Sequence, residues 1–442
     1  MTGGEPMLEM QVGRCGQWLI SLDVKLHHNR QFNAIYRALR LALPLVLIGS
    51  IADFIDQAWL QTSGYYYQTL NVSHWLFQLK LMRQYLRLIS AGTLGFSAIV
   101  MAFAVSFYLV APVTRATADR LLAGMTAVMG LKFLNVSRTS VLSLHTIHWV
   151  STNLGTQGIL IGVLVGLLVG NGYRWALQRE QIVRESLTQT VTITSIWLVL
   201  LATGGLLWTS TQRASLGSAF LALVHWPFHL PHFVLGLFGY SSLSSLLQWA
   251  GVLGPLTTIK GESIQTAQNL AAIMDHPGRA IPHPLTIHTV VSVYANMGGS
   301  GMLLALLLAW FLCRPDRAQR RLGSLCLVPT LGNYGVPLMV GLPVMLSPIL
   351  VIPFILAPLA SIGLSWLCIR FQWVPAVAYP LATGTPGPLI GYLGTGGSWA
   401  ALWLALIDLA LCTLIYWPFV KWTQLAQRQL MEEAVDHAAT KA

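Results

Sequence analysis

Long apolar runs separated by short polar stretches recur along the whole chain. In the first half the runs are continuous, at residues 38–57, 88–113, 121–137, 154–173 and 190–209. A helix needs about 20 predominantly apolar residues to cross the hydrocarbon core of a bilayer. The pattern therefore predicts an all-α polytopic membrane protein whose first half consists of ordinary spanning helices.

The apolar runs of the second half are interrupted by glycine and proline. The runs lie at 216–254, 286–313, 323–345, 346–369, 374–394 and 398–420, and they contain the motifs GLFGYSS, MGGSG, GNYGVP, TGTPGP and GTGG. Irregular backbone is tolerated at membrane depth only where protein buries it or where it lines a cavity. Such segments point to a substrate site, although kinked structural helices would give the same pattern. We expect about ten spans in all, with re-entrant hairpins in 216–238 and 323–345.

Composition supports the membrane assignment. The chain has 442 residues, of which 55% are hydrophobic and 9% are charged, whereas a soluble domain carries roughly 25% charged residues. Its net charge of +11 would also suit a nucleic-acid binder. The basic residues are scattered at the ends of apolar segments and form no stripe, so we expect no nucleic-acid partner.

The positions of the basic residues predict the orientation of the chain in the membrane. Several precede the first apolar run, a cluster occupies 314–321, and the polar tail begins at Lys421. Because cytoplasmic flanks are enriched in Lys and Arg, we expect both termini in the cytoplasm. The polar first thirty or so residues show no cleaved signal peptide.

Signatures of catalysis and of metal binding are missing. The five cysteines are far apart without a CxxC pair, so we expect neither a disulfide framework nor a metal site. His225, His229 and His232 have a spacing that suits one helical face, but no carboxylate or thiol accompanies them, which favours an interfacial position. P-loop, GxSxG and HExxH motifs do not occur. We expect no cofactor and no catalytic residue of the chain's own.

Ionisable residues inside apolar segments are functional candidates because burying a charge in lipid is costly. Lys260 and Glu262 follow a Gly/Pro break and could face either a cavity or a solvent loop. Asp408 stands alone in the last apolar run. It could be a proton site or a helix-pairing hydrogen bonder, and we favour the structural role.

Three stretches of the second half together resemble a known family. They are YANMGGSGMLLALLL, VGLPVMLSPILVIPFILAPL and TPGPLIGYLGTGGSWAALWLALIDLALCTLIYWPFVK. The chain resembles, from about Asn33 to Lys421, the membrane IIC permease of the bacterial sugar phosphotransferase system, of the lactose/cellobiose/diacetylchitobiose type. NAIYRALRLALPLVLIGSI looks like the first helix of that family.

The resemblance implies a IIC permease fold in the inner membrane. Residues 33–210 would form a homodimer contact, and 211–421 would bind a di- or oligosaccharide in a pocket lined by two hairpins. The flanking polar segments are 1–32 and 422–442. Partners would be membrane lipid and a separate cytoplasmic IIB protein that phosphorylates the incoming sugar. Only together with IIB does such a chain act as a sugar phosphotransferase.

The implied sugar-binding positions depart from the family in two places. The aligned residues are Ser241, Asn296, Gly299, Ser300, Asn333, Gly335 and Val336. Val336 stands where the family's Asn-x-Asn-Glu-Pro pattern has its glutamate. Ser241 stands where the Gly-Ile-His-Gly pattern has its histidine. Polar groups that could compensate are Lys260, Glu262, His283 and His288.

Two functions remain open at this point. The chain could be a working IIC permease with altered pocket chemistry. Alternatively, phosphoryl-coupled transport is lost, and the chain is a membrane sugar sensor or a partner of a signalling or polysaccharide-synthesis complex.

Overall fold

The described part of the chain is helical. The computed structural model describes residues 13–137, 147–179, 186–211, 216–229, 233–253, 262–275, 281–342 and 344–439. These ranges contain helices and no strand, with two isolated bridges, Gly64 to Thr383 and Val136 to Trp149. The predicted all-α fold is confirmed.

The helices of the first half follow the continuous apolar runs. They are α1 (Arg14–His28), α2 (Arg30–Ile55), α3 (Tyr65–Thr69), α4 (Leu79–Thr93), α5 (Ser97–Val110), α6 (Thr117–Leu134), α8 (Ile159–Arg179) and α9 (Ser186–Thr211). Helix α2 begins where the Asn29 side chain accepts a hydrogen bond from the Gln31 amide, which satisfies a free N–H of the first turn. Its last turn continues as a π-helical turn, Asp56–Leu60.

The second half contains nine α-helices in the described ranges, from 6 to 41 residues long. They are α10 (Leu216–His225), α11 (Phe233–Ala250), α12 (Glu262–Asp275), α13 (Leu303–Leu312), α14 (Arg317–Leu331), α15 (Val336–Gly341), α16 (Val351–Arg370), α17 (Gly387–Gly394) and α18 (Trp399–Ala439). A π-helical turn, Ile287–Ser292, precedes α13.

Six helices of the described part are long and apolar enough to span a membrane. They are Arg30–Leu60, Leu79–Val110, Thr156–Gln178, Val191–Ser210, Val351–Arg370 and Trp399–Glu433. The other expected spans lie mainly in the second half, where glycine and proline divide a run into two pieces. The run 286–313 becomes a π-helical turn, an irregular stretch and α13. The run 323–345 becomes α14, a turn and α15.

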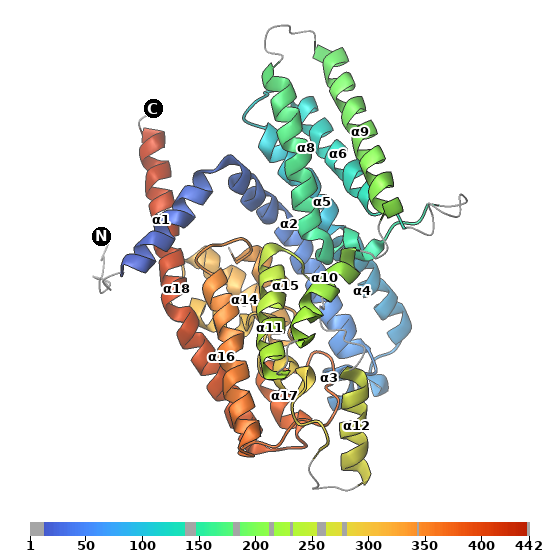
Figure 1. Ribbon diagram of the computed structural model, residues 1–442, viewed down its shortest axis with the longest axis vertical. Coiled ribbons are helices and arrows are strands. Elements are labelled where there is room, and N and C mark those ends of the chain that lie inside the picture. The colour runs from blue at the N-terminus through green and yellow to red at the C-terminus, as the bar shows by residue number, and fades with distance from the viewer. Residues whose placement is uncertain are drawn as a thin grey trace.

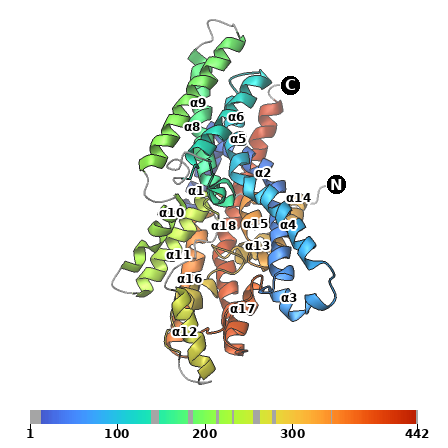
Figure 2. The same cartoon turned by 90° about the vertical axis from the view of Figure 1, so that its right-hand side faces the viewer.

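The helices bury two large apolar clusters. One lies inside the bundle of α5, α6, α8 and α9 and is built only from residues between 98 and 201. The larger one joins α11, α13, α15, α16 and α18 to the inner faces of α2 and α5. Figure 1 shows the four-helix bundle projecting from the larger body, and Figure 2 shows the same separation from the side. Helices α5 and α8 contribute residues to both clusters and therefore tie the two bodies together.

Helices α5 and α8 make the most extensive helix contact. Three glycines of α8, Gly162, Gly166 and Gly170, face α5 at every fourth residue. A Cβ atom on Gly162 would lie 2.4 Å from the Ala98 carbonyl oxygen, and one on Gly166 would lie 2.8 Å from that of Ala102. Small residues at this spacing let membrane helices approach closely.

We therefore expect Gly162→Ala to destabilise the protein, because its methyl group would force the two backbones apart. The expected loss in free energy of unfolding is about 1–3 kcal/mol, measured by thermal unfolding of the detergent-solubilised protein. Gly92→Ala in α4 is the matched control, since no atom lies within 4 Å of a Cβ there. Equal stability of the two variants would contradict the close-packing role.

Candidate functional site

An irregular segment, residues 293–302, lies between the π-helical turn and α13. Gly298, Gly299 and Gly301 adopt φ angles of +82°, +103° and +76°, a region that favours glycine. A Cβ atom on Gly301 would lie 2.2 Å from the ring of Phe354 in α16. The Tyr416 hydroxyl of α18 donates a hydrogen bond to the Gly301 carbonyl. Helices α16 and α18 thus hold this segment in place.

Asn333, at the turn between α14 and α15, connects three broken pieces of backbone. Its Oδ1 accepts from the Gly298 amide at 2.7 Å, and its Nδ2 donates to the Thr385 carbonyl at 3.2 Å. Its φ of +69° is tolerated by asparagine better than by most residues. One side chain therefore supplies hydrogen bonds that irregular backbone in an apolar surrounding would otherwise lack.

A small polar cavity lies between α11 and the irregular segment. Its polar lining comes from Ser241, Ser244, Ser245, Ser292, Asn296 and Ser300, and its volume is about 20 Å³. Three of the predicted sugar-binding residues, Ser241, Asn296 and Ser300, meet here. A water molecule needs a cavity of roughly 10–15 Å³, whereas small-molecule pockets measure about 300–1,000 Å³. In this conformation the cavity is closed to a sugar.

The other predicted sugar-binding residues lie in the neighbouring turn and outside the cavity lining. Gly299 lies close to Gly335. A Cβ atom added to Gly299 would lie 3.3 Å from the Gly335 amide nitrogen. Val336 begins α15 and packs against the larger apolar cluster. The expected first hairpin is formed by α10 and α11, but Ser241 lies within the continuous helix α11 and not at the turn.

Two of the groups proposed as substitutes for the family's glutamate and histidine, His283 and His288, do not line the cavity. Lys260 lies outside the described residues, and Glu262 is the first residue of α12. The backbone of His283 pairs with the Asn269 amide at 2.7 and 2.9 Å, and its ring bonds to Gln268. His288 is partly buried, and its buried Nε2 atom has no hydrogen-bond partner in the described ranges.

The structure describes His225 and His229 but not His232. His229 Nδ1 contacts the Trp226 carbonyl oxygen at 3.0 Å. Among the described residues no three His, Cys, Asp or Glu side chains gather as metal ligands would.

Two carboxyl groups near the turn were not expected from the sequence. Tyr334, next to Asn333, packs edge-on against Phe54 of α2 at 5.7 Å and lies within electrostatic range of Asp53 and Asp56. The buried Asp56 is paired with Arg83 at 3.1 Å and Arg87 at 3.0 Å. Asp53 lies in the last turn of α2 and Asp56 begins the π-helical turn, and no short sequence motif signals that they approach Tyr334.

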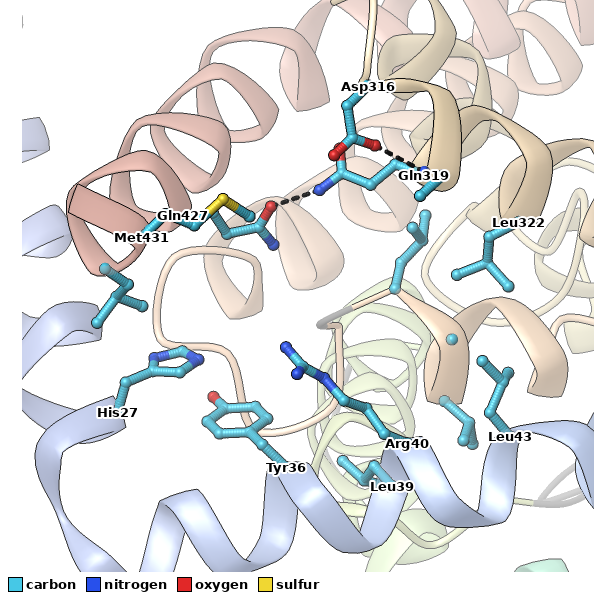
Figure 3. A pocket seen from close by; sticks show the side chains of 15 residues that line it. His27, Tyr36, Leu39, Arg40, Leu43, Asp316, Gln319, Leu322, Gln427 and Met431 are labelled. Atoms are coloured by element: carbon cyan, nitrogen blue, oxygen red, sulfur yellow. Dashed lines mark hydrogen bonds between the residues drawn. The ribbon is translucent and has the colours of Figure 1, made fainter. Parts of the chain in front are cut away.

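A larger cavity of about 500 Å³ opens between the ends of α1, α2, α14, α15 and α18. Figure 3 shows the Arg40 side chain directed into it, and His27 stacked on Tyr36 at 4.3 Å between ring centroids. Gln319 and Gln427 close one side with a hydrogen bond. None of the predicted sugar-binding residues lines it. It does reach Gly341, the last residue of the short helix that Val336 begins.

Comparison with known proteins identifies the family. A family model described as "Phosphotransferase system, EIIC" matches residues 37–358, well over half of the 442 residues. The chain belongs to the EIIC family. The predicted class, a IIC-type membrane carbohydrate permease component, is confirmed at this level.

Several curated relatives are similar over much of the chain. A putative permease IIC component, YwbA, of Bacillus subtilis is 28% identical over 64% of this chain and 67% of its own length. The oligo-beta-mannoside-specific EIIC component of the same organism is 22% identical over 97% of this chain and 98% of its own length. The lactose-specific EIICB component of Lacticaseibacillus casei is 23% identical over 64% of this chain and 52% of its own length. The matched parts thus span from about half to nearly all of these relatives.

One solved structure is also similar. It is the transporter ChbC, the IIC component of an N,N'-diacetylchitobiose-specific phosphotransferase system. It is 20% identical, with 95% of this chain and 98% of that chain covered and a TM-score of 0.42.

The bridging role of Asn333 is testable. We expect Asn333→Ala to lower the free energy of unfolding by about 2–4 kcal/mol, because two hydrogen bonds are lost and the Gly298 amide is left unsatisfied. The matched control is Asn71→Ala, since Asn71 also has a positive φ, of 46°, but no capping hydrogen bond from its side chain. If thermal unfolding shows the same loss for both variants, backbone strain and not the bridge explains the effect.

Proposed function

We propose that this chain binds a di- or oligosaccharide between α11 and the irregular segment and moves it across the membrane. The observation that carries the proposal is the convergence of Ser241, Asn296 and Ser300 on one cavity. The polar lining consists of hydroxyl and amide groups without a formal charge, which matches the hydroxyl groups of a neutral sugar. The names of the relatives for oligo-beta-mannosides and lactose support this substrate class.

Sugar entry requires the cavity to open, since it holds about 20 Å³ when closed. We propose that residues 211–421 move as the transport half while 33–210 stay as the scaffold. The separate apolar cluster of the first half, built from residues between 98 and 201, supports this division. A packed cluster of its own lets one half hold its shape while the other shifts.

The proposed orientation follows the basic residues. Arg40 and the start of α14 line one cavity together with the end of α1 and the C-terminal part of α18, so these groups lie at one end of the molecule. Placing this end in the cytoplasm of an inner-membrane protein agrees with the enrichment of Lys and Arg on that side. The 500 Å³ cavity then opens toward the cytoplasm. It would serve as the vestibule through which sugar leaves and beside which a IIB protein would dock.

A homodimer contact on the first half is part of the proposal. Of the six helices long enough to span a membrane, the span in α9, Val191–Ser210, is the least buried within the protein. Its exposed apolar side chains include Ile196, Val199, Leu200, Leu206 and Leu207. Such a face suits a second copy of the chain or lipid.

A specific observation favours the second function, carbohydrate binding without phosphoryl coupling. Val336 cannot accept a proton or a hydrogen bond, and Ser241 supplies no imidazole. The cavity lining contains no carboxylate or histidine from the described residues. A chain of this kind would act as a sugar sensor, a passive or differently energised permease, or the membrane partner of a signalling or polysaccharide-synthesis complex.

Sugar binding at the cavity can be tested with paired serine variants of α11. We expect Ser241→Ala to weaken oligosaccharide binding about 2–12-fold, the effect of losing one hydrogen bond of roughly 0.5–1.5 kcal/mol. Ser242→Ala is the control, because its hydroxyl bonds to the Phe238 carbonyl of its own helix and does not line the cavity. Affinity is measured by calorimetry with cellobiose, lactose and mannobiose. Equal affinities of the two variants for the bound sugar would place the site elsewhere.

Phosphoryl coupling can be tested by uptake. Cells carrying this chain are supplied with labelled disaccharide, with and without a IIB protein of the lactose/cellobiose type. We expect no sugar phosphate inside the cells under either condition, because the titratable pair of the family is missing. Sugar phosphate formed only with IIB would show that transport is phosphoryl-coupled and would rule out the second function.

A further inference from the structure

Asp408 of α18 is a deeply buried carboxyl group, and the nearby polar group that acts on it is the Ser361 hydroxyl of α16. Its exposed fraction is 0%, and both carboxyl oxygens are buried without a hydrogen bond to any described residue. It lies nine residues after Trp399, where α18 begins. At about 1.5 Å per residue this is roughly 14 Å along the helix. The carboxyl group therefore lies close to the middle of a hydrocarbon core about 30 Å thick.

The groups around Asp408 are polar but uncharged. They are the phenol of Tyr294 in the irregular segment, the hydroxyl of Ser361 and the thiol of Cys368 in α16, and the thiol of Cys412 one turn along α18. No charged group acts on the carboxyl within the described part. Helix α13, which packs on α18, carries no titratable side chain. In α17 the Tyr392 ring packs instead against Trp399.

The carboxyl group must hold a proton in this conformation. An ionised carboxylate without a counter-charge or hydrogen bonds is far too costly in an apolar interior. The Tyr294 hydroxyl and Ser361 Oγ are also buried without a partner in the described ranges. Buried polar atoms without a hydrogen-bond partner call for an explanation, such as a functional role or a bound water or ion.

Well-formed hydrogen bonds between α18 and its neighbours come from other residues. Cys412 Sγ donates to the Ala357 carbonyl of α16 at 3.3 Å, and the Tyr416 hydroxyl donates to the Gly301 carbonyl. The Asp408 carboxyl group approaches only the Ser361 hydroxyl of α16, so its pairing with that helix does not by itself explain a buried acid.

The carboxyl group lies directly behind the polar cavity. Tyr294 precedes Ala295 and Asn296, which line the cavity, and Ser361 lies one turn after Pro358, which also lines it. The same short stretch of irregular backbone thus faces the cavity on one side and Asp408 on the other. Any movement of that stretch that admits a sugar also changes the surroundings of the carboxyl group.

We propose that Asp408 is a proton-binding site whose proton exchanges when the irregular segment opens, so that sugar movement is coupled to proton movement. In the closed state the O–H bond of the carboxylic acid is intact. When the segment opens, water reaches the group, the O–H bond breaks, the proton passes to water, and the carboxylate is hydrated. Closure requires the carboxylate to take a proton again. The coupling to sugar rests on the proposed function; the proton exchange itself does not.

Infrared spectroscopy of the full-length protein in lipid vesicles tests the proton site without sugar. We expect a carboxylic-acid C=O band at neutral pH that disappears in Asp408→Asn and remains in the control Cys412→Ser. The band should shift in D₂O and lose intensity as pH rises. Absence of the band, or a band that neither exchanges nor titrates, would overturn the proposal even if Asp408→Asn failed to fold.

A second measurement tests the coupling. A pH-sensitive dye in weakly buffered vesicles should report proton movement when the bound disaccharide is added, and Asp408→Asn should abolish it while sugar still binds. Replacing Na⁺ by choline should change nothing; loss of the signal would assign the site to a sodium ion and contradict the proposal. Retained proton movement in Asp408→Asn would contradict it as well. If no disaccharide binds to wild type, the proposed function fails, while the infrared result still decides the proton site.

Discussion

Irregular backbone inside an apolar body must find hydrogen bonds from protein, because neither lipid nor packed side chains supply them. The Asn333 side chain meets this need for two stretches at once, through the Gly298 amide and the Thr385 carbonyl. The Tyr416 hydroxyl meets it for the Gly301 carbonyl. These few bonds hold together the turn after α14, the segment before α13 and the loop before α17. Helices α16 and α18 pack against the segment before α13.

The junction also links features that are far apart in the chain. One face of the irregular segment lines the polar cavity with Asn296 and Ser300, and the other face presents Tyr294 to Asp408. On its far side, the turn at Tyr334 reaches Phe54 and the Asp56–arginine pairs of the first half. A movement of the irregular segment would therefore disturb the polar cavity, a buried acid and the contact between the two bodies together.

Membership of the EIIC family rests on residues 37–358, whereas the proposed departure from its chemistry rests on two positions. In the proposed alignment, Val336 and Ser241 occupy the positions of the family's glutamate and histidine. Asp408, a deeply buried carboxyl group, lies in α18. Under the proposed proton coupling, the energy for transport comes from a proton and not from a phosphoryl group.

The sequence by itself determined the membrane class, the all-α fold, the continuous helices of the first half and the broken backbone of the second. It could do so because hydrophobic length and the backbone restrictions of glycine and proline are local properties. Which polar residues meet was decided only by the tertiary structure. Ser241 joins Asn296 and Ser300 while Val336 does not, Asp53 and Asp56 reach Tyr334, and Asp408 faces Tyr294. These contacts depend on how helices that are distant in sequence pack together, and no local sequence pattern predicts that packing.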